Sequence, residues 1–224
     1  MSTSDSLSVV SSRAVAAVTS YLEDFLADPQ AFRGQQLRGG GPVAEFERML
    51  ADRCGFPYCV ATCNATTALL GLAAMIRVNG RTVWFPESHW EGSVSAFRLM
   101  GARIRTYNAE RDSFQPLQRA RFAPVVIVSK CADVEVIRAT TGGLNCLIVE
   151  DSSRIPGITA DTHEFSKADI QVLSFGPGKP MCLGEGGAVL FRTRTLHDRF
   201  VSRAMHPERI ADVTGLHLAF RLGA

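Results

Sequence analysis

Lys179 stands between two glycine-rich turns, and it is the first residue whose surroundings suggest chemistry. It follows Ser174-Phe-Gly-Pro-Gly and precedes Pro-Met-Cys-Leu-Gly-Glu-Gly-Gly187, and the only other lysines are Lys130 and Lys167. Glycine lets the backbone approach a ligand closely. A lysine partly removed from water is less readily charged, and its neutral amine can form a Schiff base. The alternative is a solvated surface charge, but the position among glycines and prolines after an apolar run favours a function.

The segment Asn64-Ala65-Thr66-Thr67 lies where a predicted strand gives way to a helix. The first turn of a helix has free N–H groups and the positive end of the helix dipole, which together can bind an anion. The threonine hydroxyls add further donors. The alternative is a helix N-cap without a ligand.

Two further polar or aromatic residues stand next to predicted strands. Asp151 ends the apolar run Leu147-Ile-Val-Glu-Asp151. Its carboxylate could cap a helix, or it could pair with a protonated ring nitrogen of a bound ligand. Trp90 could belong to the core or could stack on a planar ligand.

The elements that must position these residues alternate between strand and helix. Apolar, β-rich runs predict strands at residues 58–63, 82–85, 103–107, 125–128, 146–149, 170–174 and 188–191. Helical spacing predicts helices at 13–26, 43–53, 66–78, 93–100, 134–140 and 195–205. Such alternation is typical of an α/β fold with a mostly parallel sheet covered on both faces. Ligands bind beyond the carboxyl ends of strands in these sheets. We therefore expect the polar segments that follow the strands to meet in one crevice.

The composition is that of an ordinary globular protein. The 224 residues are 46% hydrophobic and 21% charged, with a net charge of +2. That charge is too small to favour nucleic acid or an anionic membrane, and no apolar run is long enough to span a bilayer. The N-terminus resembles no secretory signal, so we expect a cytoplasmic protein. Cysteines Cys54, Cys59 and Cys63 lack the partners of a four-ligand set, so no metal site is expected.

Several segments, in this order, resemble the DegT/DnrJ/EryC1/StrS sugar-aminotransferase family of fold-type-I pyridoxal-phosphate (PLP) enzymes. The segments are Gly39-Gly-Gly-Pro-Val-Ala-Glu-Phe-Glu47, Val60-Ala-Thr-Cys-Asn-Ala-Thr-Thr-Ala-Leu69, Trp90, Gly101-Ala102, Val149-Glu-Asp151, Leu173-Ser-Phe175, Lys179 and Gly184-Glu-Gly-Gly-Ala188. The resemblance implies a three-layer α/β/α large domain like that of aspartate aminotransferase. Residues 38–224 would form this domain, after an N-terminal helical segment at residues 1–37.

The resemblance also implies a site for pyridoxal 5′-phosphate at Ala65, Thr66, Trp90, Asp151, Arg154, Ser174 and Lys179. Lys179 would form the Schiff base and move the proton between substrate and cofactor. Asp151 would hold the pyridinium nitrogen, and Trp90 would stack on the ring.

The remaining positions would contact the cofactor's oxygens. The backbone amides of Ala65 and Thr66 and the hydroxyl of Ser174 would bind the phosphate. Arg154 stands where the family usually has glutamine or histidine near the phenolic oxygen. An arginine there would stabilise a phenolate, or it would clamp a substrate carboxylate.

The activity that the resemblance implies is transfer of an amino group from an amino acid, such as glutamate, to a keto-sugar or keto-cyclitol. Such reactions serve secondary-metabolite or cell-surface sugar biosynthesis, and the family works as a homodimer. The chain ends at Ala224, where the family's small C-terminal domain would begin, and Ala219 replaces the family's asparagine. Two alternatives therefore stay open. One is a PLP-dependent lyase, dehydratase or racemase, and the other is a non-catalytic subunit whose partner chain supplies the missing domain.

Overall fold

The computed structural model of the chain describes residues 41–108, 125–129, 133–141, 146–153, 165–179 and 182–204. From residue 46 onward these belong to one compact unit, which spans residues 46–210. The predicted N-terminal segment at 1–37 lies outside the described residues, as do Arg154 and Ala219. The division of the chain near residue 38 stays a prediction.

The described residues form a seven-stranded sheet whose order is β1-β7-β6-β5-β4-β2-β3. The strands are β1 (Tyr58–Thr62), β2 (Thr82–Pro86), β3 (Arg103–Tyr107), β4 (Val125–Val128), β5 (Leu147–Asp151), β6 (Ile170–Ser174) and β7 (Gly187–Phe191). Strand β7 runs antiparallel to both of its neighbours, and every other pairing is parallel. The prediction of a mostly parallel sheet is therefore confirmed.

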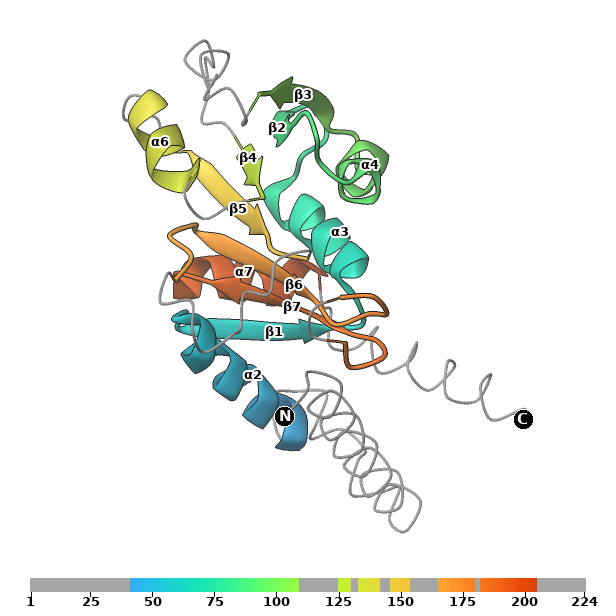
Figure 1. The fold of residues 1–224 in the computed structure, drawn as a ribbon, viewed down its shortest axis with the longest axis vertical. Coiled ribbons are helices and arrows are strands. Elements are labelled where there is room, and N and C mark those ends of the chain that lie inside the picture. Colours follow the sequence, from blue (N-terminus) through green and yellow to red (C-terminus); the bar gives the residue numbers. More distant parts are fainter. Residues whose placement is uncertain are drawn as a thin grey trace, which may run out of the picture. The chain divides into compact units, whose positions relative to one another are not determined.

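Helices cover both faces of this sheet, as buried runs of β-branched residues require. They are α2 (Gly41–Cys54), α3 (Ala65–Ile76), α4 (Glu91–Leu99), α6 (Asp133–Thr140) and α7 (Arg194–Ala204). Buried residues of α3, α4 and α7 share one core with the sheet, whereas those of α6 and α2 form separate cores with its opposite face. Figure 1 shows these helices around the sheet. The result is the predicted three-layer α/β/α arrangement.

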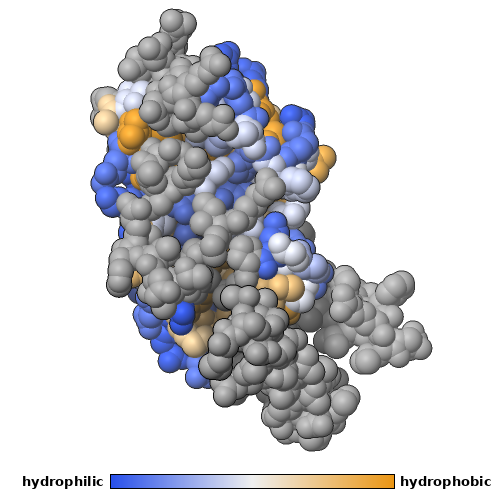
Figure 2. Space-filling view, viewed as in Figure 1, coloured by the Kyte–Doolittle hydropathy of each residue, from blue (hydrophilic) through white to orange (hydrophobic). Residues whose placement is uncertain are grey.

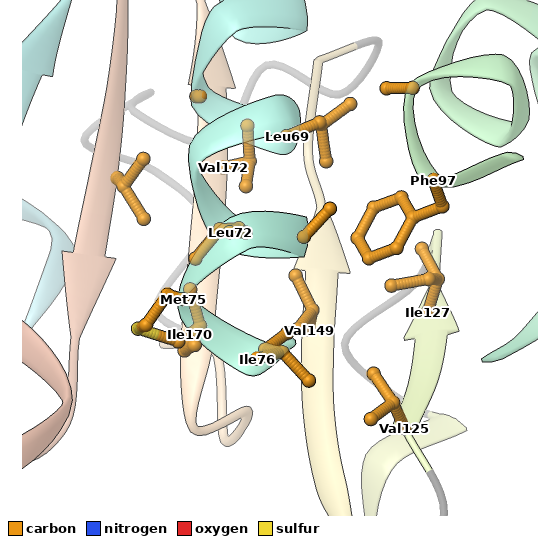
Figure 3. Close-up of a cluster of buried hydrophobic side chains, with 14 of the residues drawn as sticks. Leu69, Leu72, Met75, Ile76, Phe97, Val125, Ile127, Val149, Ile170 and Val172 are labelled. Carbon is orange, nitrogen blue, oxygen red and sulfur yellow. The ribbon is translucent and has the colours of Figure 1, made fainter. Parts of the chain in front are cut away.

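Helix α3 lies at the centre of the larger core (Figure 3). Its apolar side chains Leu69, Leu72 and Met75 are almost fully buried. They belong to the same cluster as Val149 of β5 and Val172 of β6. Each such side chain contributes about 1.5–3 kcal/mol through burial, so this packing fixes where α3 begins relative to the strand ends.

Two polar residues lie in phase with the apolar residues that face α3. Successive side chains of a strand point to opposite faces, so residues two apart share a face. Asp151 follows Val149 at this interval on β5, and Ser174 follows Val172 on β6. Both polar residues therefore lie on the α3 side, at the carboxyl ends of adjacent parallel strands.

Where Figure 2 colours the described residues, the surface is predominantly hydrophilic, with small, separated hydrophobic areas. Exposed apolar side chains include Met49 on α2 and Leu99 at the end of α4. Among the helices of the described residues, none has the length and hydrophobicity needed to cross a lipid bilayer.

Candidate active site

A pocket of about 250 Å³ lies beyond the carboxyl ends of β4, β5 and β6. That volume is just below the range of roughly 300–1,000 Å³ that is usual for small-molecule sites. Six of the seven predicted site residues line it: Ala65, Thr66, Trp90, Asp151, Ser174 and Lys179. The seventh, Arg154, lies outside the described residues.

The start of α3 forms one wall of this pocket. Asn64 has extended backbone angles, and its Oδ1 accepts a hydrogen bond from the Thr67 N–H at 2.8 Å. The Asn64 carbonyl accepts the Ala68 N–H at 3.1 Å. Among the residues that the structure describes, the N–H groups of Ala65 and Thr66 have no partner in a turn, loop or cap, so they remain as the donors of the first turn, beside the positive end of the dipole. Asn64 is therefore an N-cap, as one interpretation predicted, and the cap leaves two donors for an anion.

Gly187 allows β7 to pack directly against this helix start. A Cβ built on Gly187 would lie 2.7 Å from the Ala65 nitrogen, 2.7 Å from the Asn64 carbonyl carbon and 3.0 Å from the Leu173 oxygen. All three atoms are backbone, so no side chain can turn aside to make room. The absence of a side chain at Gly187 therefore leaves the room that the Ala65 amide occupies in the pocket wall.

Asp151 lies at the bottom of the pocket and is held by four donors. Its Oδ2 accepts from the Ser93 hydroxyl at 2.7 Å and faces the His89 Nε2 at 3.2 Å. Its Oδ1 accepts from the Ser153 N–H at 3.0 Å and from the Ser153 hydroxyl. Asp151 therefore caps no helix, and the pattern is a local turn closed by its own side chain.

The ionised form of Asp151 is strongly favoured. Burial works to raise the pKa of the Asp151 carboxyl, but hydrogen bonds from His89, Ser153 and Ser93, with the nearby His89 charge, outweigh it. The pKa falls from 3.8 to about 2. A buried anion at the bottom of a pocket is a natural partner for a cationic group of a ligand.

His89 and Ser129 were not among the predicted site residues, although both line the pocket. The His89 side chain is 4% exposed and follows β2 in the loop before α4. Its Nδ1 lies 2.9 Å from the Ser129 hydroxyl, directly after β4. Ser129 lies two residues after Ile127, which faces α3. Residues two apart in a strand share a face, and this alternation is the signal in the sequence that could have identified Ser129 as a pocket residue.

Lys179 reaches the pocket from the loop between β6 and β7. Phe175 donates its N–H to the Gly186 carbonyl at 2.9 Å, which closes the base of this loop. Gly178 has a φ of +73°, a conformation that favours glycine, and Lys179 N–H then bonds to the Gly176 carbonyl at 3.2 Å. No ion pair involves the Lys179 amine among the described residues, whereas Lys167 pairs with an acidic side chain at 2.6 Å.

Trp90 lies at the mouth of the pocket and is 62% exposed, so the interpretation as a core residue is wrong. It occupies the N-cap position of α4 without a side-chain capping bond. The indole lies so close to Gly92 that a Cβ there would collide with its ring nitrogen. The indole therefore has room beside the first turn of α4 and presents an open aromatic face.

Metal ligands do not gather in the described part of the chain, where no group of three or more His, Cys, Asp or Glu is arranged to hold an ion. The polar groups of the pocket are instead two backbone N–H donors, one carboxylate, one imidazole, one amine, the Asn64 amide, the Trp90 indole N–H and several hydroxyls.

The sequence profile of the DegT/DnrJ/EryC1/StrS aminotransferase family matches residues 23–209. The chain belongs to this family. Its curated relatives include UDP-2-acetamido-2-deoxy-3-oxo-D-glucuronate aminotransferase of Pseudomonas aeruginosa, 28% identical over 67% of this chain and 45% of the relative. GDP-perosamine synthase of Caulobacter vibrioides is 30% identical over 66% of this chain and 43% of its own length.

Solved structures that are similar to this chain share its fold. DesI, crystallised in the presence of its TDP-sugar product, is 27% identical and superposes with a TM-score of 0.59 over 72% of this chain and 44% of DesI. A DegT/DnrJ/EryC1/StrS aminotransferase from Brucella abortus is 22% identical, with a TM-score of 0.64 over 88% of this chain and 56% of that one. The chain spans about half the length of the curated relatives it matches. The family match includes every described residue of the pocket.

Proposed function

We propose that this family member binds pyridoxal 5′-phosphate at Lys179 and serves in an aminotransferase. The observation that carries the proposal is that the Lys179 amine, the Asp151 carboxylate and the free amides of α3 line one pocket. These groups come from three segments that are far apart along the chain. Membership in an aminotransferase family and the names of its relatives support the same conclusion.

The groups in the pocket fit each part of this cofactor. A phosphate needs donors, and the Ala65 and Thr66 amides supply them with the Ser174 hydroxyl nearby. A pyridinium nitrogen needs an anion, and Asp151 is buried and ionised. An aldehyde needs an amine, and Lys179 presents one. A flat ring needs an aromatic face, which Trp90 offers at the mouth.

When bound, the cofactor supplies an electron sink for the substrate carbon. The chain's residues would set the conditions for this chemistry. Asp151 would keep the proton on the ring nitrogen because its own carboxyl resists protonation. Lys179 Nζ would hold the cofactor covalently and, once released, would carry the proton to and from the substrate carbon. Trp90 would shield one face of the ring from water.

The substrate class follows from the relatives rather than from the pocket. Curated relatives carry the names of UDP-sugar and GDP-perosamine enzymes and of 3-amino-5-hydroxybenzoate synthase. We therefore propose an amino-acid donor such as glutamate and a keto-sugar or keto-cyclitol acceptor. We also propose a homodimer in the cytoplasm, with the segment that completes the site supplied by further chain or by a partner chain.

Absorption spectroscopy tests the cofactor claim. The purified chain is titrated with PLP, reduced with borohydride and digested, and the modified peptide is identified by mass spectrometry. We expect a visible band and a label on the peptide that contains Lys179. Lys179→Ala should lack both. Lys167→Ala is the matched control, because Lys167 is exposed and paired with Glu135, and it should behave as the wild type.

Amino transfer is tested on the loaded chain. Glutamate should bleach the visible band as the cofactor takes up the amino group, and a nucleotide-linked keto-sugar should restore it. Loss of water or a carboxyl group from the substrate without amino transfer would instead support the lyase alternative. A chain that binds no PLP at any concentration tested would refute the proposed function.

A further inference from the structure

His89 joins two elements of the pocket through its two ring nitrogens. Its Nε2 lies 3.2 Å from Asp151 Oδ2, and its Nδ1 lies 2.9 Å from the Ser129 hydroxyl. The ring also contacts Phe85, with centroids 5.3 Å apart. Contacts with β2, with β5 and with the residue that follows β4 thus fix the orientation of a side chain that is 4% exposed.

The partners of His89 determine where its ring protons lie. An ionised carboxylate can only accept hydrogen bonds, so Nε2 must carry a proton beside Asp151. The Ser129 hydroxyl can donate to a bare Nδ1 or accept from a protonated one. His89 therefore donates to Asp151 in either charge state.

The acceptor positions of Asp151 are fully used in this arrangement. A carboxylate has about four lone-pair sites, and Ser93, His89 and Ser153 fill them with four donors. A ring N–H that binds Asp151 must therefore replace one of them. The Ser153 hydroxyl can rotate away while its own N–H keeps its bond to Oδ1. His89 cannot rotate without losing Ser129.

We propose that His89 is a positioning residue, which is held by Ser129 and in turn keeps Asp151 ionised and oriented toward the ring nitrogen of the bound cofactor. This inference rests on the proposed function, since the ring nitrogen belongs to PLP. The role follows from the order of the contacts. Ser129 orients the imidazole of His89, and the imidazole donates to Asp151 Oδ2. Asp151 Oδ1 then becomes available to the ring N–H of the cofactor when the Ser153 hydroxyl rotates away.

The other charged groups in the pocket do not replace His89. The titratable side chains that line it among the described residues are His89, Asp151 and Lys179. Glu150 precedes Asp151 on β5 but points to the opposite face, where it bonds to Ser152 and Ser166. His89 is therefore the titratable donor that contacts Asp151, and its removal leaves a buried carboxylate with serine donors alone.

The test compares His89→Leu, His89→Gln and Ser129→Ala with the wild-type chain. The glutamine amide can place a donor near the position of Nε2, whereas leucine cannot. Each protein is titrated with PLP, and the ¹⁵N signal of ring-labelled PLP is recorded in the bound state. We expect His89→Leu to weaken PLP about tenfold, because a carboxylate that His89 no longer orients loses one charge-assisted bond to the ring N–H of the cofactor. Its ring ¹⁵N signal should shift toward that of an unprotonated pyridine, and His89→Gln should restore most of both.

A merely structural role for His89 would lower the fraction of folded protein without moving the ¹⁵N signal of bound PLP. An unshifted signal in His89→Leu, or equal behaviour of the leucine and glutamine variants, would overturn the inference. Should His89→Leu fail to fold, Ser129→Ala takes its place and should give a smaller shift in the same direction; an unshifted signal there would count against the inference.

A measurement without cofactor separates this inference from the proposed function. Imidazole ¹H–¹⁵N spectra of the wild type should show a protonated Nε2 whose proton exchanges slowly and whose signal changes in Asp151→Asn. PLP that fails to bind while this signal is present would refute the proposed function and leave the contact between His89 and Asp151 intact. PLP that binds while the signal is absent would refute the role of His89 alone.

Discussion

Replacement of Gly187 by alanine is expected to weaken cofactor binding through the backbone alone. The added Cβ would lie 2.7 Å from Ala65 N and from the Asn64 carbonyl carbon, and ordinary contacts begin at 3.4 Å. The start of α3 must therefore move by about 0.7 Å, which lengthens an N–H···O distance of ~2.9 Å beyond the limit of a hydrogen bond. Loss of one bond to a charged phosphate is worth about 1.5–3 kcal/mol, so the Kd for PLP should rise roughly tenfold to a hundredfold.

The assay is a titration with PLP and, in parallel, with pyridoxal, which lacks the phosphate. Gly187→Ala should lose affinity mainly for PLP. Gly176→Ala, in the loop that precedes β7, is the matched control, because a Cβ there would meet only the Ser174 hydroxyl at 3.9 Å. Thermal unfolding is recorded first, since overpacking itself costs about 1–3 kcal/mol. A folded Gly187→Ala chain that binds PLP as tightly as the wild type would refute the assignment of α3 as the phosphate site.

Two further predictions concern the bottom and the mouth of the pocket. Asp151 has a folded pKa of about 2, below its ordinary 3.8, so its stabilising effect is present above pH ~4 and is lost as the pH falls through ~2. At 1.36 kcal/mol per pKa unit the effect is about 2 kcal/mol. In urea unfolding, Asp151→Asn should therefore have a free energy of unfolding about 2 kcal/mol lower than the wild type at pH 7, and this free energy should depend less on pH below pH 5. The same pH dependence of the free energy of unfolding in both proteins would contradict this. Trp90→Phe should remove most of the quenching of tryptophan fluorescence by PLP, whereas Trp84→Phe should retain it, because Trp84 is 6% exposed and faces the other core.

Much of the fold was predictable because its strands are short apolar runs with polar residues at their ends. Strands β3, β4 and β6 begin and end at the predicted residues. Strand β5 was predicted at 146–149 but extends over Leu147–Asp151. Its last two residues are charged, and their pairing with β6 keeps both of them in the strand.

The site was predictable where one segment carries the signal. The capped start of α3, the lysine between glycines and the carboxylate at a strand end each stand out locally, and all line the pocket. The contacts of His89 join residues 40 and 62 positions apart, to Ser129 and Asp151. Such contacts depend on the order of strands in the sheet, so no single segment of the sequence identifies His89.

The exposure of Trp90 shows a second reason for error. A tryptophan beside an apolar strand is usually buried, and the local sequence does not distinguish the two cases. The difference arises at Gly92, which leaves space for the indole at the start of α4. The tryptophan is thereby kept at the surface and beside the pocket rather than in the core.

The measurement that tests the central claim most directly is borohydride trapping of PLP on the purified chain, followed by peptide mass spectrometry. The account predicts a single stable modification at Lys179, with no label on Lys167 and no visible band in Lys179→Ala. A label spread over several lysines, or a band that survives in Lys179→Ala, would contradict it.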